Sequence, residues 1–372
     1  MIDRVMGHLE SLVGFDTSDP VPTVTADHAI IAYAAGVLEA AGCVVTVEDL
    51  GGGCVNLLAV RGDGSPAILF NNHLDTVHVD PGWQRDPFSL TIEDGLAFGL
   101  GTCDIKGAAA CLLAAVETTD EPVAVLLTTD EEGGKGTCIE HFIRTRSFDP
   151  EVVVVAEPTR CEAVAQHRGF ASFEVTFQGS AGHTSAPDAT AGSAIHMAVR
   201  WADQALSLAE SELADSRFNI GVMQGGTASN VVSSTAKMRF GFRPAPGADA
   251  MERGRRVLRV LKDLLPNGAS GWTDRFLAPP LTASETALEA IKRWGIDRGP
   301  DVDFWTEAAL FEAGGLPAVV IGPGDIAQAH TADEFVEIAQ LERGVDTYTR
   351  IIREGVASDE KPFQKRGAAC AP

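Results

Sequence analysis

Short apolar runs alternate with longer stretches of helical periodicity in the N-terminal part of the chain. Three runs, Ala67–Asn71, Val123–Thr128 and Val152–Ala156, are apolar almost throughout, as is typical of strands that are buried on both faces. The stretches Ala26–Ala41 and Ile105–Glu117 contain no proline and carry their apolar residues at helical spacing. Because strands and helices alternate, this pattern predicts an α/β fold with a mostly parallel sheet flanked by helices.

The pattern changes near Arg168. Phe173, Val175 and Phe177 alternate with polar residues, which is typical of a sheet with one face in water. The elements that begin here follow the order strand, helix, strand, strand, helix, strand, which predicts an inserted ferredoxin-like α+β unit. After its first strand, the expected elements are Ala189–Leu208, Phe218–Gln224, Ala236–Phe242, Ala248–Leu264 and Trp272–Phe276.

The alternating α/β pattern returns after Pro279-Pro280. We expect a helix at Glu285–Trp294, a strand at Ala318–Ile321 and a last helix at Ala339–Arg353. A chain of 372 residues exceeds the usual size of a single core. We therefore predict a discontinuous larger domain, residues 1–167 and 278–372, and an inserted domain, residues 168–277.

Composition and charge restrict the class of protein. Hydrophobic residues make up 45% of the chain and charged residues 22%, as in ordinary globular proteins. The formal net charge of −23 would repel a phosphate backbone, so we expect no nucleic-acid partner. No apolar run approaches the roughly 20 residues of a membrane span, and the N-terminus is charged where a signal peptide would be apolar. We predict a cytoplasmic protein with no membrane partner.

The cysteines give no sign of a disulfide framework. There are seven, and none forms a C-x-x-C pair. A metal ion in this protein would therefore be bound by histidine and carboxylate side chains.

Candidate metal ligands stand where the predicted strands end, the position at which open α/β sheets bind their ligands. His73 and Asp75 follow the first strand and, at i and i+2, point to the same side. Glu131 and Glu132 follow the second strand. The remaining candidates are Glu157 after the third strand, Asp104 at the head of the helix Ile105–Glu117, and His330 after the last strand.

These side chains would repel one another unless cations were bound between them. Nitrogen and oxygen ligands without thiolate favour Zn²⁺, with Co²⁺ or Mn²⁺ as substitutes. We therefore predict two Zn²⁺ ions held by two imidazoles and three carboxylates, with two further acids beside them. The predicted ligands are His73, Asp104, Glu132, Glu157 and His330, and the companions are Asp75 and Glu131.

Each of these residues taken alone also has a simpler interpretation. A single acid at a strand end is more often a turn former or a helix cap, and Asp104 alone could be an N-cap. Gly99-Leu100-Gly101 suggests a dinucleotide-binding loop, but Asp104 stands where the third glycine would be. Neither G-x-S-x-G nor H-E-x-x-H occurs.

Five segments together resemble the family of zinc-dependent aminoacylases and carboxypeptidases, which includes acetylornithine deacetylase and succinyl-diaminopimelate desuccinylase. They occur in the family's order, and the likeness extends to about Arg353. The segments are His73–Val77, Gly99–Gly107, Thr129–Glu132, Ala156–Thr159 and Ala329–His330. Within the family, residues 302–308 and 322–335 most resemble acetylornithine and acetylcitrulline deacetylases.

The resemblance implies an activity: removal of the acetyl group from N-acetylornithine or N-acetylcitrulline in arginine biosynthesis. A general N-acyl amino acid amidohydrolase or a dipeptidase of the same family would have the same catalytic residues. A metal-binding protein without catalysis is a further alternative, which the presence of Glu131 and all five ligands disfavours.

The resemblance also implies a role for each residue in the centre. Asp104 would bridge two zinc ions, one completed by His73 and Glu157 and the other by Glu132 and His330. Glu131 would be the general base. Asp75 would fix the tautomer of His73.

The inserted domain would act as a lid and dimerisation domain. In it, His183 would reach the active site of a neighbouring subunit in a homodimer, while Asn230 and Arg243 would bind the substrate carboxylate. Without the resemblance, Asn230 would be interpreted as a turn residue and Arg243 as a surface cation.

Overall fold

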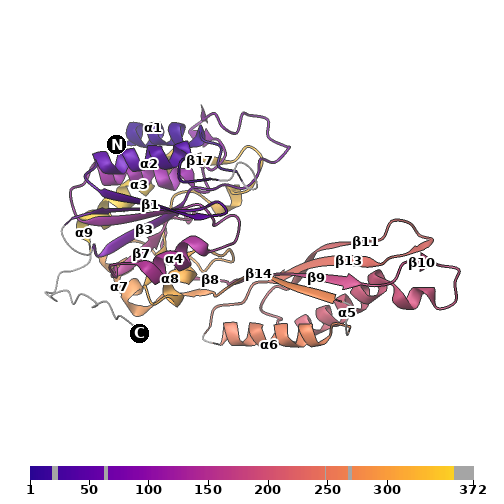
Figure 1. The fold of residues 1–372 in the computed structure, drawn as a ribbon. Coiled ribbons are helices and arrows are strands. Elements are labelled where there is room, and N and C mark those ends of the chain that lie inside the picture. The colour runs from indigo at the N-terminus through magenta and orange to yellow at the C-terminus, as the bar shows by residue number, and fades with distance from the viewer. Residues whose placement is uncertain (19–23, 63–65, 248, 267–269, 356–372) are drawn as a thin grey trace, which may run out of the picture.

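Two separate main sheets organise the chain (Figure 1). The computed structural model describes residues 1–18, 24–62, 66–247, 249–266 and 270–355. The larger sheet contains segments from both ends of the sequence, whereas the smaller one is built from a continuous middle segment.

The larger sheet has six strands in the order β1-β2-β6-β3-β7-β16. Strands β6, β3, β7 and β16 are parallel neighbours, while β1 and β2 form an antiparallel hairpin that joins the sheet through β2 and β6. The parallel strands confirm the predicted mostly parallel sheet. The bounds are β1 Val44–Gly51, β2 Cys54–Arg61, β3 Ile68–His73, β6 Val123–Thr128, β7 Val152–Val155 and β16 Ala318–Val320.

Alternate residues of the central strands enter two different hydrophobic cores. In β6, Val123 and Val125 face one cluster, while Ala124 and Leu126 face the other. This is why the strand is apolar without interruption. The first cluster packs under α1 Ile2–Val13, α2 Ala29–Ala40, α3 Lys106–Glu117, α7 Glu285–Arg293 and α9 Ile338–Glu354, and the second under α4 Thr137–Thr145 and α8 Ala308–Ala313.

A crossover through α3 connects β3 to its parallel neighbour β6, as predicted. Between β3 and α3 the chain forms two short strands, which pair with a third strand that follows η2 Ile326–Gln328. This small sheet has the order β17-β5-β4, with bounds β4 Thr91–Glu93, β5 Leu96–Phe98 and β17 Phe335–Glu337. Among the described helices, none is long and apolar enough to cross a bilayer.

The smaller main sheet is antiparallel and has the order β11-β13-β9-β14. The third hydrophobic cluster of the molecule lies between this sheet and the helices α5 and α6. It includes Phe173, Val175 and Phe177. The bounds are β9 Phe170–Gln178, β10 Gly182–His183, η1 Ala189–Gly192, α5 Ala194–Glu212, β11 Asn219–Gly225, β12 Val231–Val232, β13 Thr235–Phe242, α6 Ala250–Asp263 and β14 Ser270–Ala278.

The chain leaves the larger sheet and returns to it along one short ladder. Strand β8 (Gln166–His167) pairs with β15 (Leu281–Thr282), so the outgoing and returning segments lie side by side. His167 is buried in this ladder, and its Nε2 lies 3.0 Å from Thr306 Oγ1. We keep residues 168–277 as the proposed extent of the inserted domain.

Candidate metal centre

The predicted ligands meet at the carboxyl ends of the parallel strands. His73 is the last residue of β3, Glu132 follows β6, and Glu157 follows β7. Asp104 lies just before α3, and His330 lies in the loop between η2 and β17. The ends of three buried strands thus deliver His73, Glu132 and Glu157 to one edge of the sheet, and two further loops bring Asp104 and His330 to them.

These side chains form two groups that share Asp104. Within each of the groups His73–Asp104–Glu157 and Asp104–Glu132–His330, one ligand atom per residue lies within 4.8 Å of the others. His73 Nε2 lies 3.2 Å from Asp104 Oδ1 and 3.6 Å from Glu157 Oε1. His330 Nε2 lies 3.4 Å from Asp104 Oδ2 and 3.1 Å from Glu132 Oε1. The two oxygens of Asp104 therefore face different imidazoles, which is the arrangement of a bridging carboxylate.

Asp75 lies behind His73 and contacts its other ring nitrogen. His73 Nδ1 is 2.9 Å from the backbone oxygen of Asp75 and 3.4 Å from its Oδ1. Asp75 Oδ2 also accepts a hydrogen bond of 2.9 Å from the backbone N–H of Glu132. A proton on Nδ1 directed at Asp75 leaves Nε2 of His73 with a lone pair toward Asp104 and Glu157.

Two observations indicate that the cluster suits divalent cations. His73 Nε2 and Asp104 Oδ1 are buried 3.2 Å apart, but they do not form a hydrogen bond with each other or with any other described residue. Buried polar atoms of this kind are costly unless a ligand satisfies them. Hydrogen bonds to Asp104 and Glu132 raise the pKa of His330 to about 11, so the carboxylates hold a positive charge in place when no cation is present. The residues fit two metal ions, with oxygen and nitrogen ligands typical of zinc.

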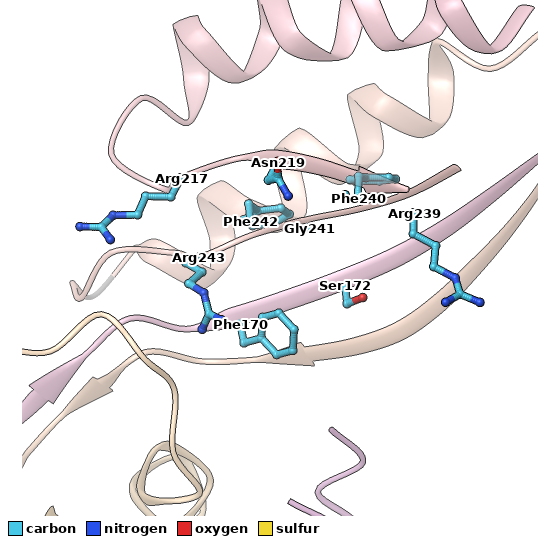
Figure 2. Close-up of a pocket in the computed structure, with 10 residues that line it drawn as sticks. Phe170, Ser172, Arg217, Asn219, Arg239, Phe240, Gly241, Phe242 and Arg243 are labelled. Atoms are coloured by element: carbon cyan, nitrogen blue, oxygen red, sulfur yellow. The ribbon is translucent and has the colours of Figure 1, made fainter. Parts of the chain in front are cut away.

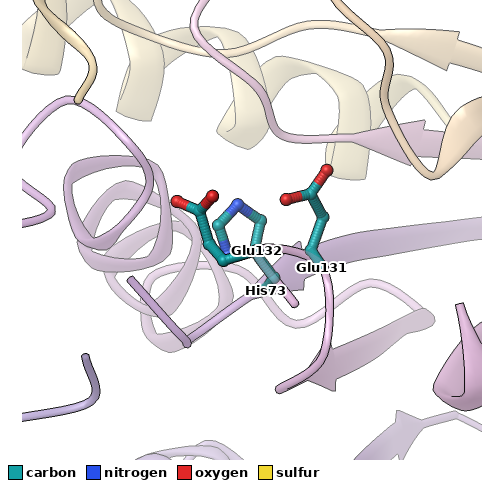
Figure 3. Close-up of side chains that lie close together, drawn as sticks. All are labelled: His73, Glu131 and Glu132. Carbon is teal, nitrogen blue, oxygen red and sulfur yellow. The ribbon is translucent and has the colours of Figure 1, made fainter. Parts of the chain in front are cut away.

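Glu131 lies next to the two groups that share Asp104 but belongs to neither of them. Figure 3 shows Glu131 and Glu132 extending toward the region of the His73 ring, and their ligand atoms lie within 4.8 Å of one another. Burial raises the pKa of Glu131 well above its usual range, with nearby carboxylates adding to the effect and His73 opposing it. The neighbouring Asp130 turns away and caps α4, accepting hydrogen bonds from the backbone N–H groups of Thr137 and Cys138.

A pocket of about 220 Å³ opens beside these residues. It is lined by Glu131 and by every predicted ligand except His73, together with Phe170, Arg243, Phe304 and Trp305. Arg243 therefore lies in the pocket of its own chain, with its guanidinium 4.8 Å from the centre of the Phe170 ring.

A second cavity, of about 260 Å³, lies on the open face of the smaller sheet and shares Phe170 and Arg243 with the first (Figure 2). Its other two guanidiniums have acidic partners. Arg239 pairs with Glu174 at 2.8 Å, and Arg217 pairs with Asp303 at 2.7 Å. Of these three arginines, Arg243 is the one that also lines the pocket of the predicted metal ligands.

His183 and Asn230 lie elsewhere. His183 is exposed on β10, and its strand pairs with β12, next to the loop that carries the exposed Asn230. The backbone N–H of Thr184 donates to the oxygen of Asn230 at 3.4 Å. Neither residue lines the metal pocket of its own chain. In Figure 1, β10 lies at the end of the smaller sheet that points away from the larger one.

Two buried carboxylates next to the centre were missed by the sequence interpretation. Glu334 accepts three backbone hydrogen bonds from the loop before α3. Glu307 accepts a hydrogen bond of 3.1 Å from Thr128 Oγ1, and burial raises its pKa to about 8. Their partners are distant in sequence, so no local spacing could have revealed them. Both lie in segments that carried the family resemblance, which was the only available signal.

Comparison of the sequence with known proteins identifies relatives over most of its length. The profile described as peptidase family M20/M25/M40 matches residues 69–354. N-acetyl-L-citrulline deacetylase from Xanthomonas campestris pv. campestris is 42% identical over 368 residues, which cover 95% of this chain and 98% of that protein.

Solved structures share the fold at lower identity. A family M20 metallo-carboxypeptidase from Sulfolobus solfataricus has a TM-score of 0.77 at 17% identity and covers 94% of this chain and 99% of its own. A tripeptidase from Staphylococcus aureus has a TM-score of 0.73 at 18% identity, with 95% and 98% coverage. At these identities the two structures show the common fold alone.

Proposed function

The chain belongs to peptidase family M20/M25/M40, and on this basis we propose that it is a metal-dependent amidohydrolase that deacetylates an N-acetyl amino acid. The near full-length relative at 42% identity supports N-acetyl-L-citrulline as the substrate, with N-acetylornithine second, and so a step in arginine biosynthesis. The products would be acetate and the free amino acid.

The observation that carries this proposal is the pair of ligand groups joined through Asp104, with Glu131 in the same pocket. Aminopeptidase-type centres hold two metals about 3.5–4 Å apart in this way. We propose His73, Asp104 and Glu157 as ligands of one zinc ion, and Asp104, Glu132 and His330 as ligands of the other. When bound, the ions would polarise the amide carbonyl and increase the acidity of a water molecule.

Glu131 would carry the proton during the reaction. Its carboxylate would take a proton from the attacking water and hand it to the departing α-amine. The side chain is partly buried and is not one of the proposed zinc ligands. It can therefore gain and lose a proton without giving up a bound zinc ion. Asp75 would keep His73 in the tautomer that leaves Nε2 free.

Arg243 would bind the substrate carboxylate. A guanidinium donates two parallel hydrogen bonds to a carboxylate, and this one lies in the metal pocket with the Phe170 ring against it. Its position in the chain's own pocket supports this role.

We propose that His183 and Asn230 act in the pocket of a second subunit, because they lie exposed and away from the pocket of their own chain. The active form would then be a homodimer in which His183 stabilises the oxyanion of the partner's reaction. We further propose a cytoplasmic location, in keeping with a biosynthetic reaction.

The substrate is tested by steady-state hydrolysis with zinc-loaded protein. The panel contains N-acetylcitrulline, N-acetylornithine, N-acetylmethionine and a dipeptide. We expect kcat/KM to be greatest for N-acetylcitrulline. A higher kcat/KM for the dipeptide or for N-acetylmethionine would instead assign a general peptidase or aminoacylase activity. If no amide of the panel is hydrolysed, the proposed amidohydrolase activity is rejected.

A further inference from the structure

The carboxylate of Glu334 holds the loop that carries Asp104. Glu334 is 1% exposed, and its Oε1 accepts hydrogen bonds from the backbone N–H groups of Cys103 at 2.8 Å and Asp104 at 2.9 Å. Its Oε2 accepts a third, from Gly101 at 2.9 Å. One buried side chain thus satisfies three amides of a loop more than 200 residues away in sequence.

The loop itself has little freedom. Gly101 has a φ of +84°, and a Cβ there would lie 2.9 Å from side-chain atoms of both Thr76 and Lys106. A Cβ on Gly107 would lie 2.2 Å from the backbone oxygen of Thr102. The backbone is packed this closely because the loop folds back on the start of α3, and its amides point inward at Glu334.

Glu334 also connects the two ends of the metal centre. It stands four residues after His330, and its backbone oxygen accepts a hydrogen bond of 3.1 Å from the N–H of Gly99. Immediately after it, β17 pairs with β5, the strand that leads into the Asp104 loop. The segments that supply Asp104 and His330 are therefore attached to each other through this residue.

We propose that Glu334 is a positioning residue that fixes Asp104 relative to His330, so that both oxygens of Asp104 are placed to bridge two cations. The inference rests on the proposed role of Asp104 as a shared ligand. Glu334 belongs to neither ligand group, and its two oxygens are directed at the three amides of the loop.

A glutamine at this position would disturb the arrangement without changing its size. An amide has one oxygen, so its NH₂ group would face at least one N–H donor of the loop. Asp104 would then lose its fixed place, and supporting residues of this kind typically contribute about 10–100-fold to metal affinity.

The experiment measures zinc affinity of the full chain by competition with a chromophoric chelator, without substrate. E334Q is compared with the wild type and with the control E312Q. Glu312 accepts two backbone hydrogen bonds, both at Oε1, from Ser284 at 2.8 Å and Ala318 at 3.0 Å, and it lies outside the metal pocket. It therefore controls for the Glu-to-Gln change at a backbone-bound carboxylate away from the centre. We expect E334Q to bind zinc about 10–100-fold more weakly and E312Q to bind like the wild type.

Wild-type zinc affinity in folded E334Q would overturn the proposal, as would an equal loss in E312Q. If E334Q does not fold, E334D replaces it: the charge remains, but the shorter side chain cannot reach all three amides. Weaker zinc binding by E334D than by the matched E312D would support the proposal, and equal binding would overturn it. The zinc-affinity measurement uses no substrate, so its outcome is independent of the hydrolysis assay. If the wild type binds zinc but hydrolyses no amide in that assay, the proposed function is rejected and the proposal for Glu334 is not.

Discussion

At the scale of single residues, three consecutive acids after β6 serve three different purposes. Asp130 caps α4, Glu132 contacts His330, and Glu131 remains in the pocket beside the ligand groups. Side chains that leave a tight turn point in different directions, so adjacency in sequence does not imply a shared role. The assignment of the general base depends on this divergence.

Replacing Glu131 by Gln tests that assignment. Turnover should fall by about 10²–10⁴-fold because the amide cannot accept the proton. Zinc content should stay at two ions per chain, measured by atomic absorption. Glu140→Gln, the same change at an exposed position of α4, serves as the control and should leave both quantities unaltered. Loss of zinc from the Glu131 variant would make this residue a ligand rather than the base.

Arg243→Ala tests the proposed carboxylate site. We expect kcat/KM to fall by about 10–100-fold, mainly through KM, because a charge-assisted hydrogen bond to the substrate is removed. Arg239→Ala removes a guanidinium that is paired with Glu174 and lies in β13, the strand that Arg243 directly follows. This control should leave both kinetic constants close to wild type. Equal effects of the two substitutions would contradict a specific role for Arg243.

Single residues also mark the limit of prediction from sequence. The positions of His73, Glu132 and Glu157 followed from strand ends, because polar residues after a buried strand stand out. Glu334 and Glu307 do not stand out, since their hydrogen-bond partners come from distant segments. The location of Arg243 in the pocket likewise depends on how the two sheets are placed.

At the scale of elements, burial decides which segments could be predicted. The apolar run Val123–Thr128 coincides with β6 because both of its faces are covered. Strand β1 was not predicted, since most of its residues are exposed and β2 is the strand that it pairs with. The predicted helix Ala189–Leu208 proved to be two elements, with Ser193 capping the start of α5.

Trp201→Ala tests whether the inserted domain is stabilised by its own core. Trp201 is 1% exposed, packs against Phe177 and Phe240, and donates a hydrogen bond from its indole to the oxygen of Leu261. We expect the free energy of unfolding to fall by about 3–5 kcal/mol.

The proposed ligands all lie outside residues 168–277, so zinc binding should persist in this variant while the domain melts earlier. Calorimetry with zinc titration measures both. The early transition is the melting of the inserted domain. If zinc binding is lost in that transition, the inserted domain and the part of the chain that carries the ligands do not unfold independently.

At the scale of the whole molecule, the distance between His183 and the centre of its own chain favours catalysis shared between two copies. Mixing chains that carry Glu131→Gln with chains that carry His183→Ala tests this sharing. Each variant alone should be nearly inactive. A mixed dimer would contain one site with an intact Glu131 and a partner's intact His183, so the mixture should recover roughly a quarter of wild-type activity.

Subunits must be allowed to exchange before the assay, and size-exclusion chromatography reports the oligomeric state. No recovery in a mixture shown to contain mixed dimers would place His183 outside the partner's reaction. Full activity of the His183 variant alone would remove the residue from the chemistry.

The claim on which the function depends is that Asp104 joins two cation sites that are required for hydrolysis. The most direct measurement is the rate of N-acetyl-L-citrulline hydrolysis by chelator-treated protein as zinc is added back. We predict negligible hydrolysis without zinc, activity that is complete at two equivalents per chain, and no recovery in Asp104→Asn. Undiminished hydrolysis after the metal has been removed, or full activity of Asp104→Asn, would contradict this account.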